Sequence, residues 1–502
     1  MTVGVVVNPN WLHRTPAPSS SVDAAFAVCA LASYDRVKAM LARCDPSSTA
    51  GLLLSATAWQ CEGAVVRAES ALRRAAENAS GADRPYVVEL LAPLLISRGL
   101  FTRAAALLDV AAIPPRFEAG QLALRAVVAA ATGNIRLSEQ HCFAAREAIA
   151  RTDDAALCLR VHQRLASAAF YRGRASDALD EVAQGLRAAR SLGAHRAACT
   201  LHAIAYATHA GITGDVDAAR RRAYAMARQA DLGGDASCRA SARIAIADLA
   251  AERGDDSEVA AARAALESEG LPRRYRARFS GGIADALRLG WGGEFTKCRD
   301  ALTGLMDTTG RTDGERSLCR AMLALASVAL ADDDAARRFS RQAISSSARP
   351  HKQVAAFELR YRRLARALAV VAGDLVGDIV RGRRAAGARF LREDAGVTAL
   401  LRLRGDASPD GMPASVRGYA RFIDVVRKAV DRRPSAGPLT DSEAGILRLL
   451  ASGRNAPQIA AVLSRSPHTV RTHIRNASAK LEARGRVDML ARAQQLGVLA
   501  RA

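Results

Sequence analysis

Apolar residues between positions 22 and 400 recur with the spacing of helices, in a pattern that repeats along this whole stretch. Each repeat predicts an apolar helix, a turn that contains glycine, and a second, amphipathic helix. One such pair cannot bury its apolar face alone, so the pattern predicts pairs stacked into an all-helical array. The turn glycines, spaced 34 to 41 residues apart, are Gly63, Gly99, Gly133, Gly173, Gly214, Gly254 and Gly293.

Small residues stand at fixed distances from these glycines. They let paired helix backbones approach, while glycine provides a left-handed turn. The offsets resemble the tetratricopeptide repeat (TPR), although the period is longer, most aromatic positions are missing and the terminal proline is absent. The resemblance implies a TPR-like α-solenoid; an irregular helical bundle is the alternative. The alanines seven residues before each glycine are Ala56, Ala92, Ala126, Ala166, Ala207, Ala247 and Ala286, and the small residues five after are Ala68, Ala104, Ala178 and Ala219.

The pattern changes at both ends of the array. Residues 1–20 contain three prolines beside a run of serines, which predicts a flexible leader. Glycines and prolines between 402 and 413 predict a break, and residues 431–438 have the composition of a linker. The helix between them places Val416, Tyr419, Phe422, Ile423, Val426 and Val430 on one face. We expect a leader (1–20), a TPR-like repeat domain (21–400), a helix and linker (401–437) and a C-terminal domain (438–502).

The C-terminal domain carries start and stop signals for helices. Thr440 with Glu443 and Asn455 with Gln458 have capping-box spacing and begin the first and second helices. Gly453 ends the first helix, and Ser466 followed by Pro467 begins the third. We expect the core to contain Ile446, Leu447 and Leu450, then Ile459, Val462 and Leu463, then Val470, Ile474, Ala477 and Leu481.

The third helix, at about 467–484, presents polar surfaces when its residues are placed about 100° apart. One side carries His468, Thr472, Arg475 and Ala479 with Arg471 at its edge, and a flank carries Thr469, His473, Asn476 and Lys480. Arginine can donate two hydrogen bonds to guanine, worth ~1–3 kcal/mol of discrimination, and the flank can hold phosphates. The amides beside Ser466 also favour a phosphate. Taken alone, the arginines favour a solvated surface, and His473 is compatible with a packed structural histidine.

This segment resembles the LuxR/FixJ (GerE-like) DNA-binding domain over about 60 of 502 residues. The resemblance implies a four-helix helix-turn-helix fold in which Arg471, Thr472 and Arg475 contact bases. It implies backbone contacts by Thr469, His473 and Asn476, to which the helix geometry adds Ser466 and Lys480. In relatives the fourth helix, here with Val487, Leu490 and Ala491, often forms a dimer. The matching residues are Leu439, Thr440, Glu443, Gly453, Ile459, Ala460, Ser466, Thr469, Val470, Thr472, His473, Ile474, Asn476, Lys480, Leu481 and Arg486.

Two residues depart from the family pattern. Ser442 stands where the family usually has arginine, and Glu482 where it usually has glycine at the end of the third helix. We expect Gly485 to provide the helix stop three residues later. These departures affect detailed backbone contacts and leave the fold unchanged.

Composition supports an all-α protein of more than one domain. The 502 residues are rich in helix formers and only 4% aromatic, and the net charge of +22 indicates a polyanionic partner, although the basic excess is spread along the chain. Nine dispersed cysteines and the histidines of the array lack metal spacing, so we expect buried cysteines and no metal.

The sequence lacks the motifs of nucleotide binding, nucleophilic hydrolysis and zinc peptidases, which predicts no enzyme, no catalytic residue and no cofactor. No signal peptide or membrane span is predicted, which indicates a cytoplasmic, nucleoid-associated protein without a membrane partner.

These patterns favour a sequence-specific transcription regulator. The C-terminal domain would bind double-stranded promoter DNA as a homodimer, with RNA polymerase as a further candidate partner. The repeats would receive a protein, a peptide or a small effector, and the sequence does not distinguish these. The alternative is an interaction scaffold whose helix-turn-helix serves mainly dimerisation.

Overall fold

A computed structural model of the chain describes residues 21–109, 114–268, 282–306, 313–347, 356–376, 395–402, 408–431, 439–495 and 498–499. All regular secondary structure in these ranges is helical, which confirms the predicted all-α class. The chain divides into two compact units, Met1–Val426 and Arg427–Ala502, and each is described by itself. The predicted leader and the predicted linker after Asp431 lie outside the described residues.

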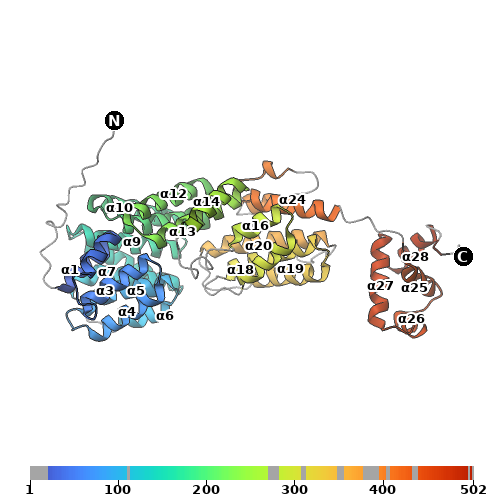
Figure 1. Cartoon of the computed structure of the whole chain (residues 1–502), viewed down its shortest axis with the longest axis horizontal. Helices are drawn as coiled ribbons and strands as arrows, with labels where there is room; N and C mark the ends of the chain where they lie inside the picture. The colour runs from blue at the N-terminus through green and yellow to red at the C-terminus, as the bar shows by residue number, and fades with distance from the viewer. Residues whose placement is uncertain are drawn as a thin grey trace. The chain divides into compact units, whose positions relative to one another are not determined.

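The first unit is a TPR-like solenoid, as predicted, in which successive helices pack on one another (Figure 1). One irregularity is the π-helix η2 (His209–Thr213). The other elements are α1 (Ser21–Leu31), α2 (Tyr34–Leu41), α3 (Thr49–Cys61), α4 (Val65–Asn78), α5 (Arg84–Ser97), α6 (Phe101–Asp109), α7 (Pro115–Ala131), α8 (Ile135–Ile149), α9 (Ala155–Tyr171), α10 (Ala175–Leu192), α11 (His195–Thr208), α12 (Val216–Gly233), α13 (Ala236–Arg253), α14 (Asp256–Ser268), α16 (Ile283–Trp291), α17 (Phe295–Met306), α18 (Asp313–Ala329), α19 (Asp333–Ser347), α20 (Ala356–Leu375), α23 (Ala395–Arg402), the 3-10 turn η3 (Pro409–Gly411) and α24 (Arg417–Asp431).

The repeated turns have the predicted geometry. All seven repeat glycines have φ between 70° and 83°, the left-handed conformation that glycine adopts at little cost. Five of the seven alanines that precede them, and all four small residues that follow them, have no exposed surface. Ala207 and Ala247 are only partly buried. Ala207 lies just before η2, whose extra residue changes its helical offset from Gly214.

The cysteines and the helix compositions add two findings. All nine cysteines are free thiols, and six of them are buried, as expected for small core residues. None of the helices within the described ranges has both the length and the apolar character that crossing a bilayer requires.

The solenoid curves until its first helices touch helices of its middle. Helix α1 contacts α11, and α3 contacts α13. Arg196 on α11 donates from Nη1 to the carbonyl oxygen of Cys29 at 3.1 Å, across 167 residues of sequence. Its Nε lies 3.5 Å from Asp235 Oδ2. These contacts close the first superhelical turn.

Helix α24 packs on the solenoid through a glycine. A Cβ added to Gly418 would lie 1.8 Å from the carbonyl oxygen of Ala251 on α13, so only glycine permits this approach. The indole Nε1 of Trp291 donates to the carbonyl oxygen of Gly418 at 2.9 Å. Phe422 on α24 is fully buried, and a Cβ at Gly290 would meet its ring at 2.5 Å. This helix is therefore part of the first unit's core.

A buried ion pair secures the same region. Arg360 on α20 donates from Nη1 and Nη2 to the two carboxylate oxygens of Glu252 on α13, at 3.0 and 2.8 Å. The guanidinium also donates to the carbonyl oxygen of Ser415 at 3.2 Å, just before α24. Both side chains are less than a tenth exposed. A planar, bidentate pair of this kind fixes the three segments relative to one another.

The second unit contains four helices: α25 (Asp441–Ala451), α26 (Ala456–Val462), α27 (Pro467–Lys480) and α28 (Arg486–Gln495). The predicted core is largely confirmed, with Ile474 packed at its edge and a buried cluster of Ile446, Leu447, Leu450, Ile459, Ala460, Val470, Ala477, Leu481, Met489, Ala493 and Leu499. The prediction was wrong for Val462 and Leu463, which are 56% and 37% exposed. Helix α26 has only seven residues, so its last turn lies beyond the core.

Gly418→Ala is expected to destabilise the first unit by about 2–3 kcal/mol, because the added methyl group collides with rigid backbone. Urea unfolding followed by circular dichroism measures the change. Gly304→Ala on α17 is the matched control, since a Cβ there meets nothing within 4 Å. That variant should be neutral or stabilising by up to about 1 kcal/mol. Equal stability of the two variants would contradict the close approach at Gly418.

Candidate nucleic-acid interface

Helix α25 begins with the predicted capping box. The amide of Glu443 donates to Thr440 Oγ1 at 3.3 Å, and the amide of Thr440 donates to Glu443 Oε2 at 2.8 Å. Asn455 and Gln458 make the same reciprocal pair at 3.0 Å in both directions, at the start of α26. Each box satisfies two amides that a helix start would otherwise leave without partners.

Glu443 also holds α27 against α25. The ammonium of Lys480 donates to Glu443 Oε2 at 2.7 Å. The Glu443 side chain is only 4% exposed and that of Lys480 is 26% exposed. Burial of the Glu443 carboxyl acts to raise its pKa, but the hydrogen bonds from Lys480 and Thr440 outweigh this and hold the pKa below its usual value.

The turn between α26 and α27 contains a left-handed residue. Ser464 has φ +49°, an uncommon conformation for a residue with a side chain. Ser466 then begins α27 as predicted: its Oγ accepts from the amide of Thr469 at 3.1 Å and lies 2.8 Å from Thr469 Oγ1. Pro467 occupies the first helical position. The cap sets the direction in which α27 leaves the turn.

The predicted base-contacting residues lie on the outer part of α27. Arg471 and Arg475 are exposed, and Thr472 is half-buried with its hydroxyl donating to the carbonyl oxygen of His468 at 3.1 Å. The opposite side of the helix is fully buried at Val470 and Ala477. Helix packing therefore fixes the orientation of the two arginines, which stand one turn apart.

The predicted backbone-contacting residues separate into two groups. Ser466 and Asn476 are exposed, and Thr469 and His473 are half-buried, all with access to the surface of α27. Lys480 differs, because its ammonium is bound by Glu443 inside the unit.

The sequence analysis left out Arg465. Its Nη1 donates to Nε2 of His473 at 3.1 Å, so it joins the turn to the flank of α27. The sequence signal that could have identified Arg465 was its position, one residue before the predicted cap residue Ser466.

Helix α27 ends just before Glu482, a residue type that rarely adopts the left-handed backbone conformation. Glu482 has φ +50°, directly after the C-cap Leu481. Glycine would adopt this conformation without strain, which gives a physical reason for glycine in the family pattern. The expectation that Gly485 ends the helix was wrong, because the stop lies at Glu482; Gly485, with φ +98°, instead shapes the approach to α28.

Arginine and aspartate side chains fix α28. Arg486 Nη2 donates to the carbonyl oxygens of Leu450 and Arg454, at 2.8 and 3.2 Å, and so caps the end of α25. Asp488 Oδ2 accepts from the amide of Arg484 at 2.6 Å. Of the three residues predicted to dimerise, Val487 is 84% exposed and Ala491 is exposed, whereas Leu490 packs against the core.

An open hollow of about 540 Å³ lies beside the outer part of α27. Arg471 and Arg475 line it from α27, and Arg486 lines it from the start of α28. Glu482 is the one acidic residue in its wall. The charged side chains that line the hollow are therefore mainly cationic, and two of them are the exposed arginines of α27.

Comparison with known proteins places the second unit in a family. Residues 437–493 match the family described as bacterial regulatory proteins, luxR family. The chain is also 39% identical over 67 residues to the transcriptional regulatory protein DesR of Bacillus subtilis (strain 168). That match covers 13% of this chain and 34% of DesR, so the chain spans about a third of the length of this relative. The C-terminal unit is thus a LuxR-family domain, as its sequence predicted.

One solved structure is similar to most of the chain at a low level. It is a signal transduction ATPase with numerous domains (STAND) that carries a tetratricopeptide repeat sensor, from Pyrococcus horikoshii. The similarity has a TM-score of 0.35 and 13% identity, and covers 76% of this chain and 51% of that one. At this level it bears on neither function nor mechanism.

Glu443→Gln is expected to destabilise the C-terminal unit at pH 7 by about 2–3 kcal/mol, because Lys480 loses its buried partner. The pKa of Glu443 is lowered in the folded state, so its contribution is present above the unfolded pKa of about 4.3 and is lost as pH falls through the folded value. The difference should therefore be clearly smaller at pH 3 than at pH 7. Hydrogen exchange of α25 and α27 peptides measures it, with exposed Asp441→Asn as control. An equal loss at both pH values would contradict the ion pair.

Proposed function

We propose that this protein is a sequence-specific, DNA-binding transcription regulator whose α27 lies in the major groove of promoter DNA. The observation that carries the proposal is the composition of α27 and its cap: residues 466–480 contain two exposed arginines and no acidic residue, on a helix whose opposite face is buried. The match of residues 437–493 to the luxR family supports it. Arg471, Thr472 and Arg475 are proposed to contact base edges.

Phosphate contacts are proposed for the rest of the exposed surface. Ser466, Thr469, His473 and Asn476 offer hydroxyl, imidazole and amide groups along one flank of α27. Arg465, which the sequence analysis omitted, adds a guanidinium beside His473. Lys480 is proposed to act by holding α27 on α25, because its ammonium already binds a buried carboxylate. Affinity should fall steeply with salt, since each neutralised phosphate releases counterions.

Dimerisation through α28 is the second element of the proposal. Val487 leaves most of its apolar surface in solvent, and Ala491 stands one helical turn later on the same side. A second copy of this helix would cover both residues in a two-fold arrangement. A dimer of this kind would place two copies of α27 on half-sites about 10 bp apart.

The repeat domain is proposed to receive the signal. Its inner surface is formed by successive repeats and offers a concave face of the kind that α-solenoids use for partners. A protein, a peptide or a small effector bound there would change the affinity for DNA or for RNA polymerase.

Arg475→Ala should reduce the preference among duplexes, and Thr469→Ala should weaken all duplexes alike. Loss of a bidentate contact to guanine removes about 1–3 kcal/mol of discrimination at one base pair, whereas loss of a phosphate contact costs about 0.5–1.5 kcal/mol regardless of sequence. Selection of preferred duplexes followed by gel-shift titration measures both. Arg136→Ala, an exposed arginine on α8, is the charge-matched control and should change neither. Negligible effects of both α27 variants would favour the interaction scaffold.

Val487→Glu should weaken binding to duplexes with two half-sites and leave binding to a single half-site unchanged. The carboxylates of two copies would face each other in an apolar contact, which opposes association. Fluorescence anisotropy on both duplexes and sedimentation of the complexes provide the measurement. Val66→Glu, at a valine 71% exposed on α4, is the matched control. If both duplexes respond equally to Val487→Glu, α28 does not form the dimer.

A further inference from the structure

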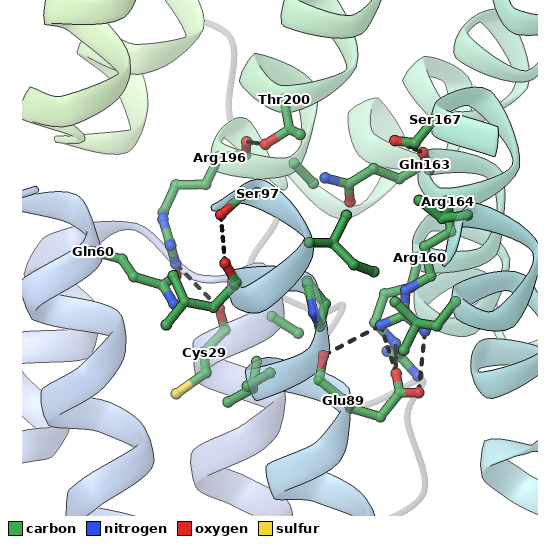
Figure 2. A pocket seen from close by; sticks show the side chains of 18 of the residues that line it. Cys29, Gln60, Glu89, Ser97, Arg160, Gln163, Arg164, Ser167, Arg196 and Thr200 are labelled. Atoms are coloured by element: carbon green, nitrogen blue, oxygen red, sulfur yellow. Dashed lines mark hydrogen bonds and ion pairs between the residues drawn. The ribbon is translucent and has the colours of Figure 1, made fainter. Parts of the chain in front are cut away.

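Helices of the first superhelical turn line a partly open cavity of about 420 Å³ (Figure 2). Residues of α1, α3, α5, α7, α9 and α11 line it, so the first helix of each successive pair contributes to its wall. The contact of Arg196 with Cys29 closes the ring of helices beside it. The result is a pocket of the size that proteins use for small organic ligands.

The cavity wall is mostly apolar with a few polar groups. Its apolar part includes Phe26, Leu94, Leu124, Val127 and Tyr171. The side chains of Gln60, Ser97, Gln163 and Thr200 add hydrogen-bonding groups (Figure 2). A wall of this composition suits a ligand with an apolar body and a small polar head.

A cluster of charged side chains lies at one end of the cavity. Arg164 on α9 donates from Nη1 and Nη2 to the two carboxylate oxygens of Glu89 on α5, at 3.1 and 2.8 Å. The Glu89 side chain has no exposed surface. Figure 2 shows Arg160, one turn before Arg164, reaching toward the same carboxylate. The Glu89 carboxylate therefore has a bidentate partner in Arg164, and Arg160 lies beside this pair.

Arg160 is the surplus cation of this cluster. Its Nε lies 3.6 Å from Glu89 Oε2, beyond hydrogen-bond distance, and this buried nitrogen has no hydrogen-bond partner. The guanidinium lies 5.2 Å from the ring of Phe26, and the side chain is 17% exposed. Among the residues lining the cavity, Glu89 is the one carboxylate, against three arginines. Arg196 has its own partner in Asp235, which leaves Arg160 without a full counter-charge.

A largely buried guanidinium without a full counter-charge is costly unless an anion completes it, and the part of the Arg160 side chain that remains exposed is 17%. Burial also lowers the pKa of Arg160, and the carboxylates of Glu89 and Asp154 only partly oppose this. A carboxylate has the planar geometry that a guanidinium binds best. The apolar wall beyond Arg160 would then cover the rest of the ligand.

We propose that this cavity binds a small amphipathic carboxylate, with the carboxylate on Arg160 and the hydrocarbon body against Phe26, Leu124 and Val127. Binding itself is independent of the DNA-binding role. The further claim that this ligand is the signal received by the repeats rests on the proposed function.

Calorimetric titration of the full chain with octanoate tests the proposal, with 1-octanol as the neutral probe of equal chain length and acetate as the head group alone. Octanoate should bind saturably at one site per chain, more tightly than either. Arg160→Gln should weaken octanoate about tenfold or more, the loss of one charge-assisted hydrogen bond, and leave 1-octanol unchanged. Arg160→Lys keeps the charge and should retain part of the affinity. Arg136→Gln, the exposed control on α8, should bind octanoate like the unaltered protein.

Two outcomes would overturn the proposal. One is equal affinity of the unaltered protein for octanoate and 1-octanol, a comparison that needs no variant to fold. The other is unchanged octanoate affinity in Arg160→Gln with an unaltered circular dichroism spectrum. The signalling role is tested separately by gel shift with and without octanoate. Binding by calorimetry without a change in DNA affinity refutes the signalling role alone. Failure to bind any duplex, both with and without octanoate, refutes the proposed function and leaves the cavity proposal standing.

Discussion

Close approach of helix backbones is the constraint on which the first unit depends. With only 4% aromatic residues, the core cannot be filled by large rings, so helices must approach until small side chains touch. Alanines with no exposed surface line the repeats, and Gly418 lets α24 reach the backbone of α13. Tight packing of pair on pair also sets the curvature, and this curvature brings α1 and α3 back to α11 and α13. The cavity inside the first turn is therefore a consequence of the same packing.

Local chemistry explains why so much of the fold could be predicted from the sequence. Capping boxes at Thr440 and Asn455, the cap at Ser466 and the repeat glycines act over three or four residues, and the structure has each of them. The predictions that were wrong lie where contacts with a distant segment override the local preference of the sequence. Glu482 adopts a glycine-like conformation because α28, held by Arg486 on the end of α25, requires the chain to turn there.

Contacts between distant segments could not be predicted in this way. Helical periodicity places a residue on a face, but it does not say which other helix covers that face. Arg196 meets Cys29 across 167 residues, and Arg164 meets Glu89 across 75. Lys480 looked like a phosphate ligand because its partner, Glu443, is 37 residues away and already served a recognisable cap. Val462 follows the apolar pattern of α26 and is still 56% exposed.

Burial decides what kind of anion each arginine of this basic chain can bind. On α27 the guanidiniums of Arg471 and Arg475 are exposed, and exposed charges are screened by salt, so they act effectively only on a polyanion that presents many phosphates together. Arg160 is almost enclosed, where screening is weak and a single charge matters more. The cavity before it, of about 420 Å³, has the size of a small-molecule site. In the two proposed roles one chain uses the same side chain for two classes of anion, and the packing of helices, more than the net charge, separates them.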